Sequence, residues 1–222
     1  MNPPLSHDPA ITLAMAYAPR DARPVFEDLF ALDRRLADAV RQASEPIIAQ
    51  MKLAWWRDRF AQDPGDWPRG EPLLARLTQW QADGGANLSQ LGALVDGWEQ
   101  IAAADELTPD VALAFAEQRA RSWAVAASAL GIAELGTLDM AGMRWALADL
   151  AQHCASDAER ALVREVARDC GHAGGQRPAL PRRLRPFAIL AVLGGRALQR
   201  QRPMLSGGGD FLAAVRAGML GR

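Results

Sequence analysis

The chain has 222 residues, 50% of them apolar and 23% charged, which is typical of one globular domain that buries a core without cross-links. Its net charge is −1, and its two cysteines are too few for a disulfide framework and suit a reducing compartment. Residues 1–9 lack the segments of a secretory signal, and the apolar run 186–195 is too short to span a bilayer, so we expect a cytoplasmic protein.

The first predicted helix covers residues 24–43. Its apolar residues recur every three or four positions, as on one face of a helix: Val25, Leu29, Leu32, Leu36 and Val40. The next helix is predicted to begin at residues 44–46, where Ser44 is a suitable N-cap and Pro46 suits the first turn.

The segment 46–60 (PIIAQMKLAWWRDRF) predicts a helix that is apolar around most of its circumference. Such a helix must be covered from more than one side. The tandem pair Trp55 and Trp56 is therefore expected in or next to the core. Lining a ligand cavity is the alternative role for both side chains.

The rest of the chain is also predicted to be helical, because Ala and Leu dominate and β-branched runs are absent. Thr108 and Pro109 indicate a helix start, and Gly131 indicates a helix end. Residues 63–70 and 171–181 are rich in Gly and Pro, which is typical of connectors. The sequence thus predicts one all-α bundle over residues 1–222 with roughly eight to ten helices. The further helices are expected at 71–82, 88–104, 109–130, 139–153, 157–170, 182–200 and 209–220.

Positive charge is concentrated at the C-terminal end. Residues 173–222 carry nine Arg and one acid, Asp210, a sum of +8, whereas residues 1–172 carry 16 basic and 25 acidic residues, a sum of −9. Arg182, Arg183 and Arg185 are the candidate contacts of this basic segment. Three partners are open: the protein's own acidic body, an anionic membrane at its inner face, or an acidic protein. Nucleic acid is disfavoured because no recognition motif accompanies the arginines.

Residues 52–58 (KLAWWRD) resemble a run that recurs in the squalene/phytoene synthase family. Further stretches in the same order are similar to that family, so the resemblance covers residues 10–200. These stretches are residues 94–99, 115–119, 126–131 and 180–186. The resemblance implies the all-α bundle of the trans-isoprenyl diphosphate synthases, also called the terpenoid synthase fold.

The resemblance also implies a chemistry. Enzymes of this family join two allylic diphosphates, and aspartate-rich motifs on two facing helices hold the Mg²⁺ that neutralises the leaving diphosphate. The first motif, R-x-x-D-D-x-x-D, corresponds to residues 34–41, where Ala37 and Arg41 occupy two aspartate positions. Only Asp38 remains, and its neighbours Arg34, Arg35 and Arg41, three or four residues away on the same helix face, are expected to pair with it.

The second motif, D-x-x-x-D, corresponds to residues 149–153. Asp149 is present, but His153 replaces the second aspartate and is a poor ligand for Mg²⁺. Asp38 and Asp149 are therefore weak catalytic and metal candidates, and His153 a weak metal candidate. For each of them an ordinary polar helix face is the simpler interpretation. Arg34 and Trp145, together with the tandem tryptophans, are the candidates to line a ligand cavity.

The missing aspartates favour a protein of this family without prenyltransferase activity, acting in assembly or in binding an isoprenoid or lipid. A mitochondrial assembly factor for respiratory complex I has a similar domain and also lacks the full aspartate motifs, so a respiratory-complex subunit is an implied partner. The alternative is an active prenyltransferase, and Mg²⁺ is the expected cofactor only in that case. Facing carboxylates at a wet pocket would favour the enzyme, and a filled interior would favour assembly.

Overall fold

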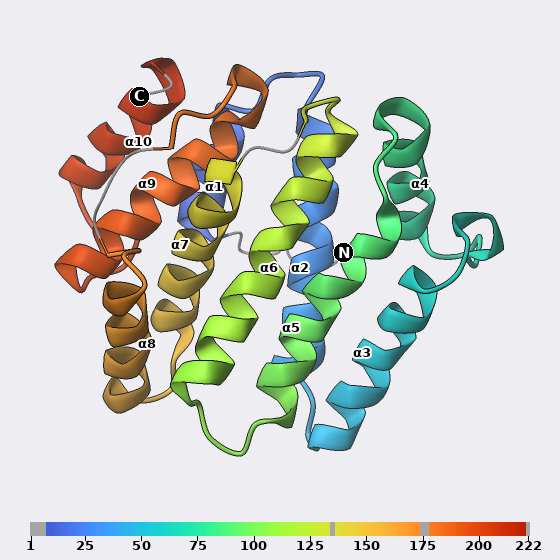
Figure 1. The fold of residues 1–222 in the computed structure, drawn as a ribbon, viewed down its shortest axis with the longest axis horizontal. Helices are drawn as coiled ribbons and strands as arrows, with labels where there is room; N and C mark the ends of the chain where they lie inside the picture. Colours follow the sequence, from blue (N-terminus) through green and yellow to red (C-terminus); the bar gives the residue numbers. More distant parts are fainter. Residues whose placement is uncertain (1–7, 134–135, 174–177, 221–222) are drawn as a thin grey trace, which may run out of the picture.

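The computed structural model describes residues 8–133, 136–173 and 178–220. Within these residues the chain forms ten α-helices and no strand, which confirms the all-α prediction (Figure 1). The helices are α1 (Pro9–Ala16), α2 (Arg23–Arg41), α3 (Pro46–Phe60), α4 (Pro72–Gly84), α5 (Gly92–Ala103), α6 (Pro109–Ala129), α7 (Gly136–His153), α8 (Asp157–Asp169), α9 (Arg185–Arg200) and α10 (Gly208–Leu220). Short 3₁₀ turns, η1 to η3, lie at Pro64–Asp66, Leu88–Leu91 and Arg182–Leu184.

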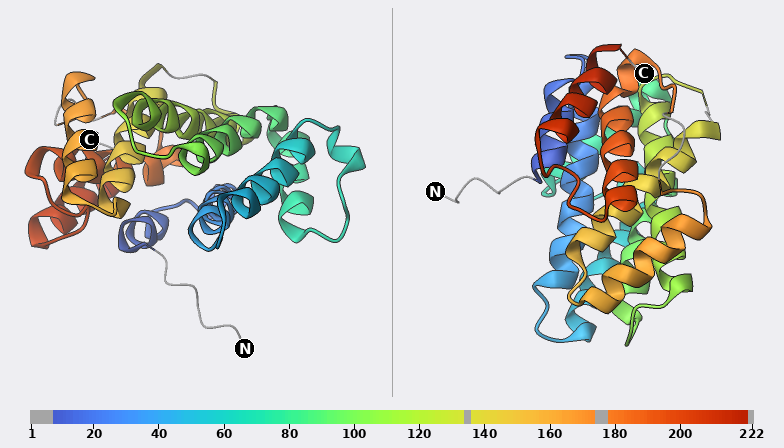
Figure 2. Two further views of the ribbon diagram at one scale, coloured as in Figure 1. Left: turned by 90° about the horizontal axis from the view of Figure 1, so that it is seen from below. Right: turned by 90° about the vertical axis from the view of Figure 1, so that its left-hand side faces the viewer.

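The helices form a broad array in two layers. Helices α5, α6 and α7 lie side by side in Figure 1, and α2 passes behind α6. The view from below in Figure 2 shows α1, α2 and α3 in one layer and α5, α6 and α7 in the other. The α9–α10 pair lies at one end of the array, and α3 and α4 lie at the opposite end.

Most helix boundaries follow local chemistry. The Thr108 side chain accepts a hydrogen bond from the Val111 N–H, as the predicted N-cap should, and Gly131 ends α6 with φ +67°. Two boundary predictions were wrong. Ser44 is not the N-cap of α3, because Glu45 holds that position and makes no capping hydrogen bond. Helix α1 was not predicted; it has only eight residues and starts at Pro9, directly after its N-cap Asp8.

The core is densest where α6, α7 and α9 meet. Trp123 of α6 stacks on Phe187 of α9 with ring centroids 3.9 Å apart, and both side chains are fully buried. Gly142 lets α7 approach α6 closely, because a Cβ at this position would lie 2.9 Å from the Cα of Ala120. This close approach brings the polar side chains of α6 and α7 within reach of each other.

Helix α3 corrects one sequence prediction and confirms another. Trp56 lies in the core with 7% exposure, and Trp55 lies beside it in an edge-to-face contact but is 37% exposed. Ile47 and Met51 are 55% and 68% exposed, so α3 is covered from one side only. The prediction of cover from more than one side was wrong because only its inner face packs on neighbours such as α2 and α5. We call the exposed row Ile47, Met51 and Trp55 the α3 stripe.

Candidate functional site

A buried arginine joins two aspartates from different helices. Arg119 of α6 donates from Nε and Nη2 to the two carboxylate oxygens of Asp33 on α2, at 3.1 and 2.5 Å. Its Nη1 donates to Oδ2 of Asp149 on α7 at 2.6 Å. All three residues are less than 9% exposed. One guanidinium therefore bridges carboxylates from the two sides of the bundle interior.

Aromatic rings surround this bridge. The Arg119 guanidinium carbon lies 4.0 Å from the ring centroid of Trp145 and 5.6 Å from that of Trp98. The Trp98 indole N–H also donates to Oδ1 of Asp33 at 3.0 Å. We call Arg119, Asp33, Asp149, Trp98 and Trp145 the Arg119 cluster. Its rings exclude water, and a desolvated cation–π contact contributes up to about 2 kcal/mol.

Electrostatics keep the Arg119 guanidinium charged. Burial alone would lower the pKa of Arg119, but the charges and hydrogen bonds of Asp33 and Asp149 outweigh it, so this pKa is raised above its ordinary value. The cluster holds two carboxylates and one guanidinium. Arg119 therefore serves as the internal counter-ion that the two buried carboxylates require.

The placement of these side chains follows from helical spacing. Asp33 lies four residues after Leu29 and three before Leu36, so it shares their buried face. Arg119 lies four residues after Phe115 and four before Trp123, both buried. A charged residue on an apolar helix face is the signal that could have identified Asp33 and Arg119, although neither was predicted as a site residue.

The structure separates the predicted candidates. Among the described residues, Asp38 forms ion pairs with Arg34 and Arg41 of its own helix, each at 3.7 Å, as expected for a helix face. The third expected partner, Arg35, pairs with Glu71 instead. Asp149, in contrast, belongs to the Arg119 cluster, and His153 contacts it from one turn later in α7, with Nδ1 3.5 Å from Oδ1. The carboxylate that reaches Arg119 from α2 is Asp33, not Asp38.

The oxygens of these two carboxylates already have partners within the chain. Each oxygen of Asp33 accepts a hydrogen bond from Arg119, and the two oxygens of Asp149 contact Arg119 and His153. Mg²⁺ needs several oxygen ligands in octahedral geometry, and a guanidinium already occupies the space where the carboxylates converge. Across the described parts of the chain, no group of three or more His, Cys, Asp or Glu side chains is placed to hold a metal ion.

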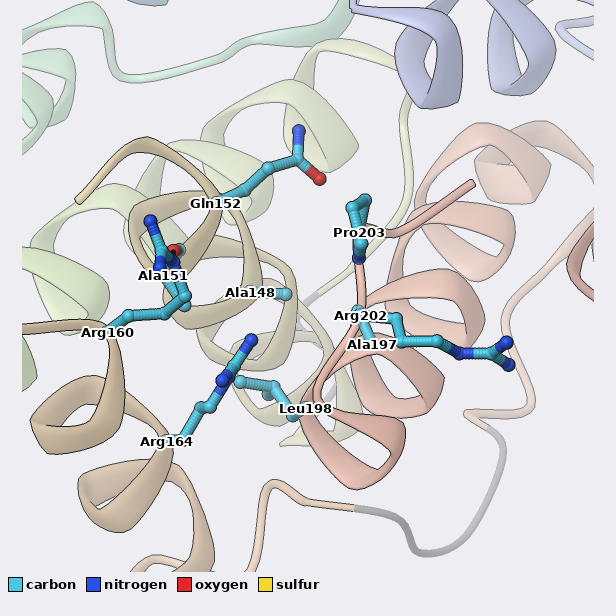
Figure 3. Close-up of a pocket in the computed structure, with 9 residues that line it drawn as sticks. All are labelled: Ala148, Ala151, Gln152, Arg160, Arg164, Ala197, Leu198, Arg202 and Pro203. Atoms are coloured by element: carbon cyan, nitrogen blue, oxygen red, sulfur yellow. Dashed lines mark hydrogen bonds between the residues drawn. The ribbon is translucent and has the colours of Figure 1, made fainter. Parts of the chain in front are cut away.

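A pocket of about 330 Å³ lies elsewhere, between α7, α8, α9 and the loop that follows α9 (Figure 3). Its lining consists of Ala148, Ala151, Gln152, Arg160, Arg164, Ala197, Leu198, Arg202 and Pro203. The four residues predicted to line a ligand cavity, Arg34, Trp55, Trp56 and Trp145, are not among them. Trp145 instead packs on Arg119, and Trp56 packs in the core.

The basic C-terminal segment is partly docked on the chain itself. Arg183 forms an ion pair with Asp21 at 2.7 Å and donates to the carbonyl of Leu130. Arg185 donates to the carbonyl of Met219, whereas Arg182 is exposed. Arg177 and Arg222 lie outside the described residues. No helix that the structure describes is long and apolar enough to cross a bilayer.

Comparisons with known proteins agree with the resemblance seen in the sequence. Residues 6–120 match the family model described as squalene/phytoene synthase. The matched segment includes Asp33 and Arg119 and ends before Asp149. No curated protein and no solved structure matches the chain.

Proposed function

Since the chain belongs to the squalene/phytoene synthase family, we propose that it is a member without prenyltransferase activity that acts by binding and assembly. The observation that carries this proposal is the Arg119 bridge between Asp33 and Asp149. In the resemblance described above, carboxylates from facing helices hold Mg²⁺ for the leaving diphosphate. In this chain an internal cation, Arg119, lies between a carboxylate of α2 and a carboxylate of α7.

Displacing that cation would be costly. Arg119 would lose three charge-assisted hydrogen bonds and its contact with the Trp145 ring. Each charge-assisted hydrogen bond contributes about 1.5–3 kcal/mol. A diphosphate with Mg²⁺ would have to offset that loss with only two carboxylates as ligands. The geometry therefore favours a structural role for the cluster over metal-assisted ionisation of an allylic diphosphate.

A binding role is supported by surfaces that the chain leaves uncovered. The α3 stripe exposes large apolar side chains, which typically marks a contact surface for another protein. A protein that assists assembly, for example by binding a subunit of a respiratory complex, would use a surface of this kind. The filled interior around Arg119 agrees with that function, because assembly requires no reaction chamber.

The C-terminal helix suits attachment to an anionic membrane. Helix α10 exposes Phe211, Leu212 and Met219, and Arg216 on the same helix is also exposed. Asp210, the only acidic residue in residues 173–222 of the sequence, is buried and forms ion pairs with Arg196 and Arg200. Apolar side chains beside cations are the features of helices that bind at a bilayer interface. On this basis we propose that the protein attaches to the inner face of a membrane.

The direct test is incubation of the purified protein with farnesyl or geranylgeranyl diphosphate and Mg²⁺, with pyrophosphate release and prenyl products as readouts. An active family enzyme provides the positive control. We expect no magnesium-dependent turnover. Turnover that depends on Mg²⁺ and is abolished by Asp149→Asn, but not by Asp38→Asn, would establish the alternative function of an active prenyltransferase.

A further inference from the structure

We propose that the pocket between α7, α8 and α9 binds an anionic amphiphile, a phosphate or carboxylate group that carries a short aliphatic chain. The pocket does not depend on the chemistry of the Arg119 cluster. Ala148 lines the pocket and Asp149 belongs to the cluster, and consecutive residues of a helix point about 100° apart. The two sites therefore lie on different faces of α7.

The floor of the pocket is formed by apolar residues, most of which have small side chains. Ala148 and Ala151 of α7 face Ala197 and Leu198 of α9, and Pro203 closes one side. Small side chains leave the space open, and its volume of about 330 Å³ lies at the lower end of the range for ligand pockets. A short aliphatic chain fits such a hollow, whereas a long polyprenyl chain exceeds it.

Arginines supply the polar side. In Figure 3, Arg164 reaches from α8 toward Ala148, whereas the guanidinium of Arg202 points away from it. Within the described residues, Arg164 donates one hydrogen bond, to the main-chain carbonyl of Gln201 at 3.0 Å, and forms no ion pair with a carboxylate. A guanidinium has five donors, so Arg164 keeps further N–H groups for a ligand. A half-buried cation without a counter-ion, beside an apolar floor, favours a ligand that is anionic at one end.

The other polar groups at the rim are already engaged. Arg160 pairs with Asp157 and donates to the carbonyls of Ala151 and Cys154, so its charge is offset. Gln152 donates to Asp8 and accepts from the Met204 N–H. The Asp8 carboxylate on that side would repel an anion. We therefore expect the ligand head group at Arg164 and its chain along Ala148 and Leu198.

The test is isothermal titration of the full chain with octyl phosphate, and separately with octanol and with inorganic phosphate. Wild-type protein should bind octyl phosphate more tightly than either fragment alone. Arg164→Gln keeps a donor for the Gln201 carbonyl but removes the charge, so it should weaken octyl phosphate binding about tenfold or more and leave octanol binding unchanged. Arg168→Gln, an exposed position one turn later in α8, is the matched control and should change neither.

Filling the pocket tests its location. Ala148→Leu should abolish binding of both octyl phosphate and octanol, and Ala197→Val should weaken both if the first variant fails to fold. Vesicles that contain phosphatidic acid distinguish a lipid head group from a soluble amphiphile, because a bilayer source requires the pocket variants to lose vesicle binding as well. Equal affinity of wild type and Arg164→Gln for octyl phosphate, equal affinity for inorganic phosphate, or no binding at all would overturn the proposal.

Discussion

Replacing Arg119 by methionine tests the energetics of the Arg119 cluster. The substitution removes three hydrogen bonds to Asp33 and Asp149 and leaves two buried carboxylates without a counter-ion. Methionine retains much of the apolar contact with the Trp145 ring, so lost packing is a minor part of the effect. Removing one partner of a buried ion pair typically costs 3–5 kcal/mol, and we expect Arg119→Met to destabilise the fold by about 4 kcal/mol.

The free energy of unfolding, from urea titration followed by circular dichroism, is the measurement. Arg121→Met is the matched control, because Arg121 is exposed on the same helix and, among the described residues, donates a hydrogen bond only to the Gln118 side chain, at 3.2 Å. It should change stability by less than about 0.5 kcal/mol. Adding Asp33→Asn and Asp149→Asn to Arg119→Met should recover part of the loss, because the uncompensated charges are then removed. A loss below about 1 kcal/mol for Arg119→Met, or no recovery in the triple variant, would refute the counter-ion assignment.

Four further outcomes are expected. Trp56→Ala should cost about 3–5 kcal/mol in urea titration and Trp55→Ala about 1 kcal/mol, since only Trp56 is buried; equal losses would contradict the placement of α3. Gly142→Ala should lower stability by about 1–3 kcal/mol through overpacking against α6, and an unchanged melting temperature would contradict that contact. Burial lowers the pKa of His172 below its ordinary value of 6.5, so its contribution to stability should be complete above pH 6.5 and should be lost as the pH falls from 6.5 through the lowered pKa. His172→Gln should flatten this pH dependence of stability, and an unaltered pH profile would contradict the role of His172. Arg216→Glu should reduce flotation with anionic vesicles but not with neutral ones, and added salt should weaken wild-type binding; equal recovery on both vesicle types would contradict a membrane role for α10.

Much of the fold could be predicted because its determinants are local. Apolar spacing located α2, and Thr108 and Gly131 located the two ends of α6. Helix α1 is the element that spacing missed, because eight residues provide barely two turns of pattern. The number of helices that pack on α3 was also not predicted, since the sequence shows which residues are apolar but not how many neighbours a helix has.

The site was predictable only in part, for a physical reason. The sequence identified Asp149 and the absence of aspartates at Ala37 and Arg41, and it selected Asp38 as the remaining carboxylate. The Arg119 cluster, however, joins residues that are 86 and 30 positions apart in the chain. No local sequence pattern predicts the contact between Asp33 and Arg119. Only the packing of α2, α6 and α7 places them together.

Magnesium-dependent binding of a substrate analogue distinguishes a metal site from a site that Arg119 already fills. Isothermal titration of farnesyl thiodiphosphate into the wild-type protein should be run in matched buffers that contain either Mg²⁺ or EDTA. If Arg119 closes the site between Asp33 and Asp149, the two titrations should show the same weak or absent binding. Tight binding that requires Mg²⁺, and that is lost in Asp149→Asn but retained in Asp38→Asn, would contradict the account.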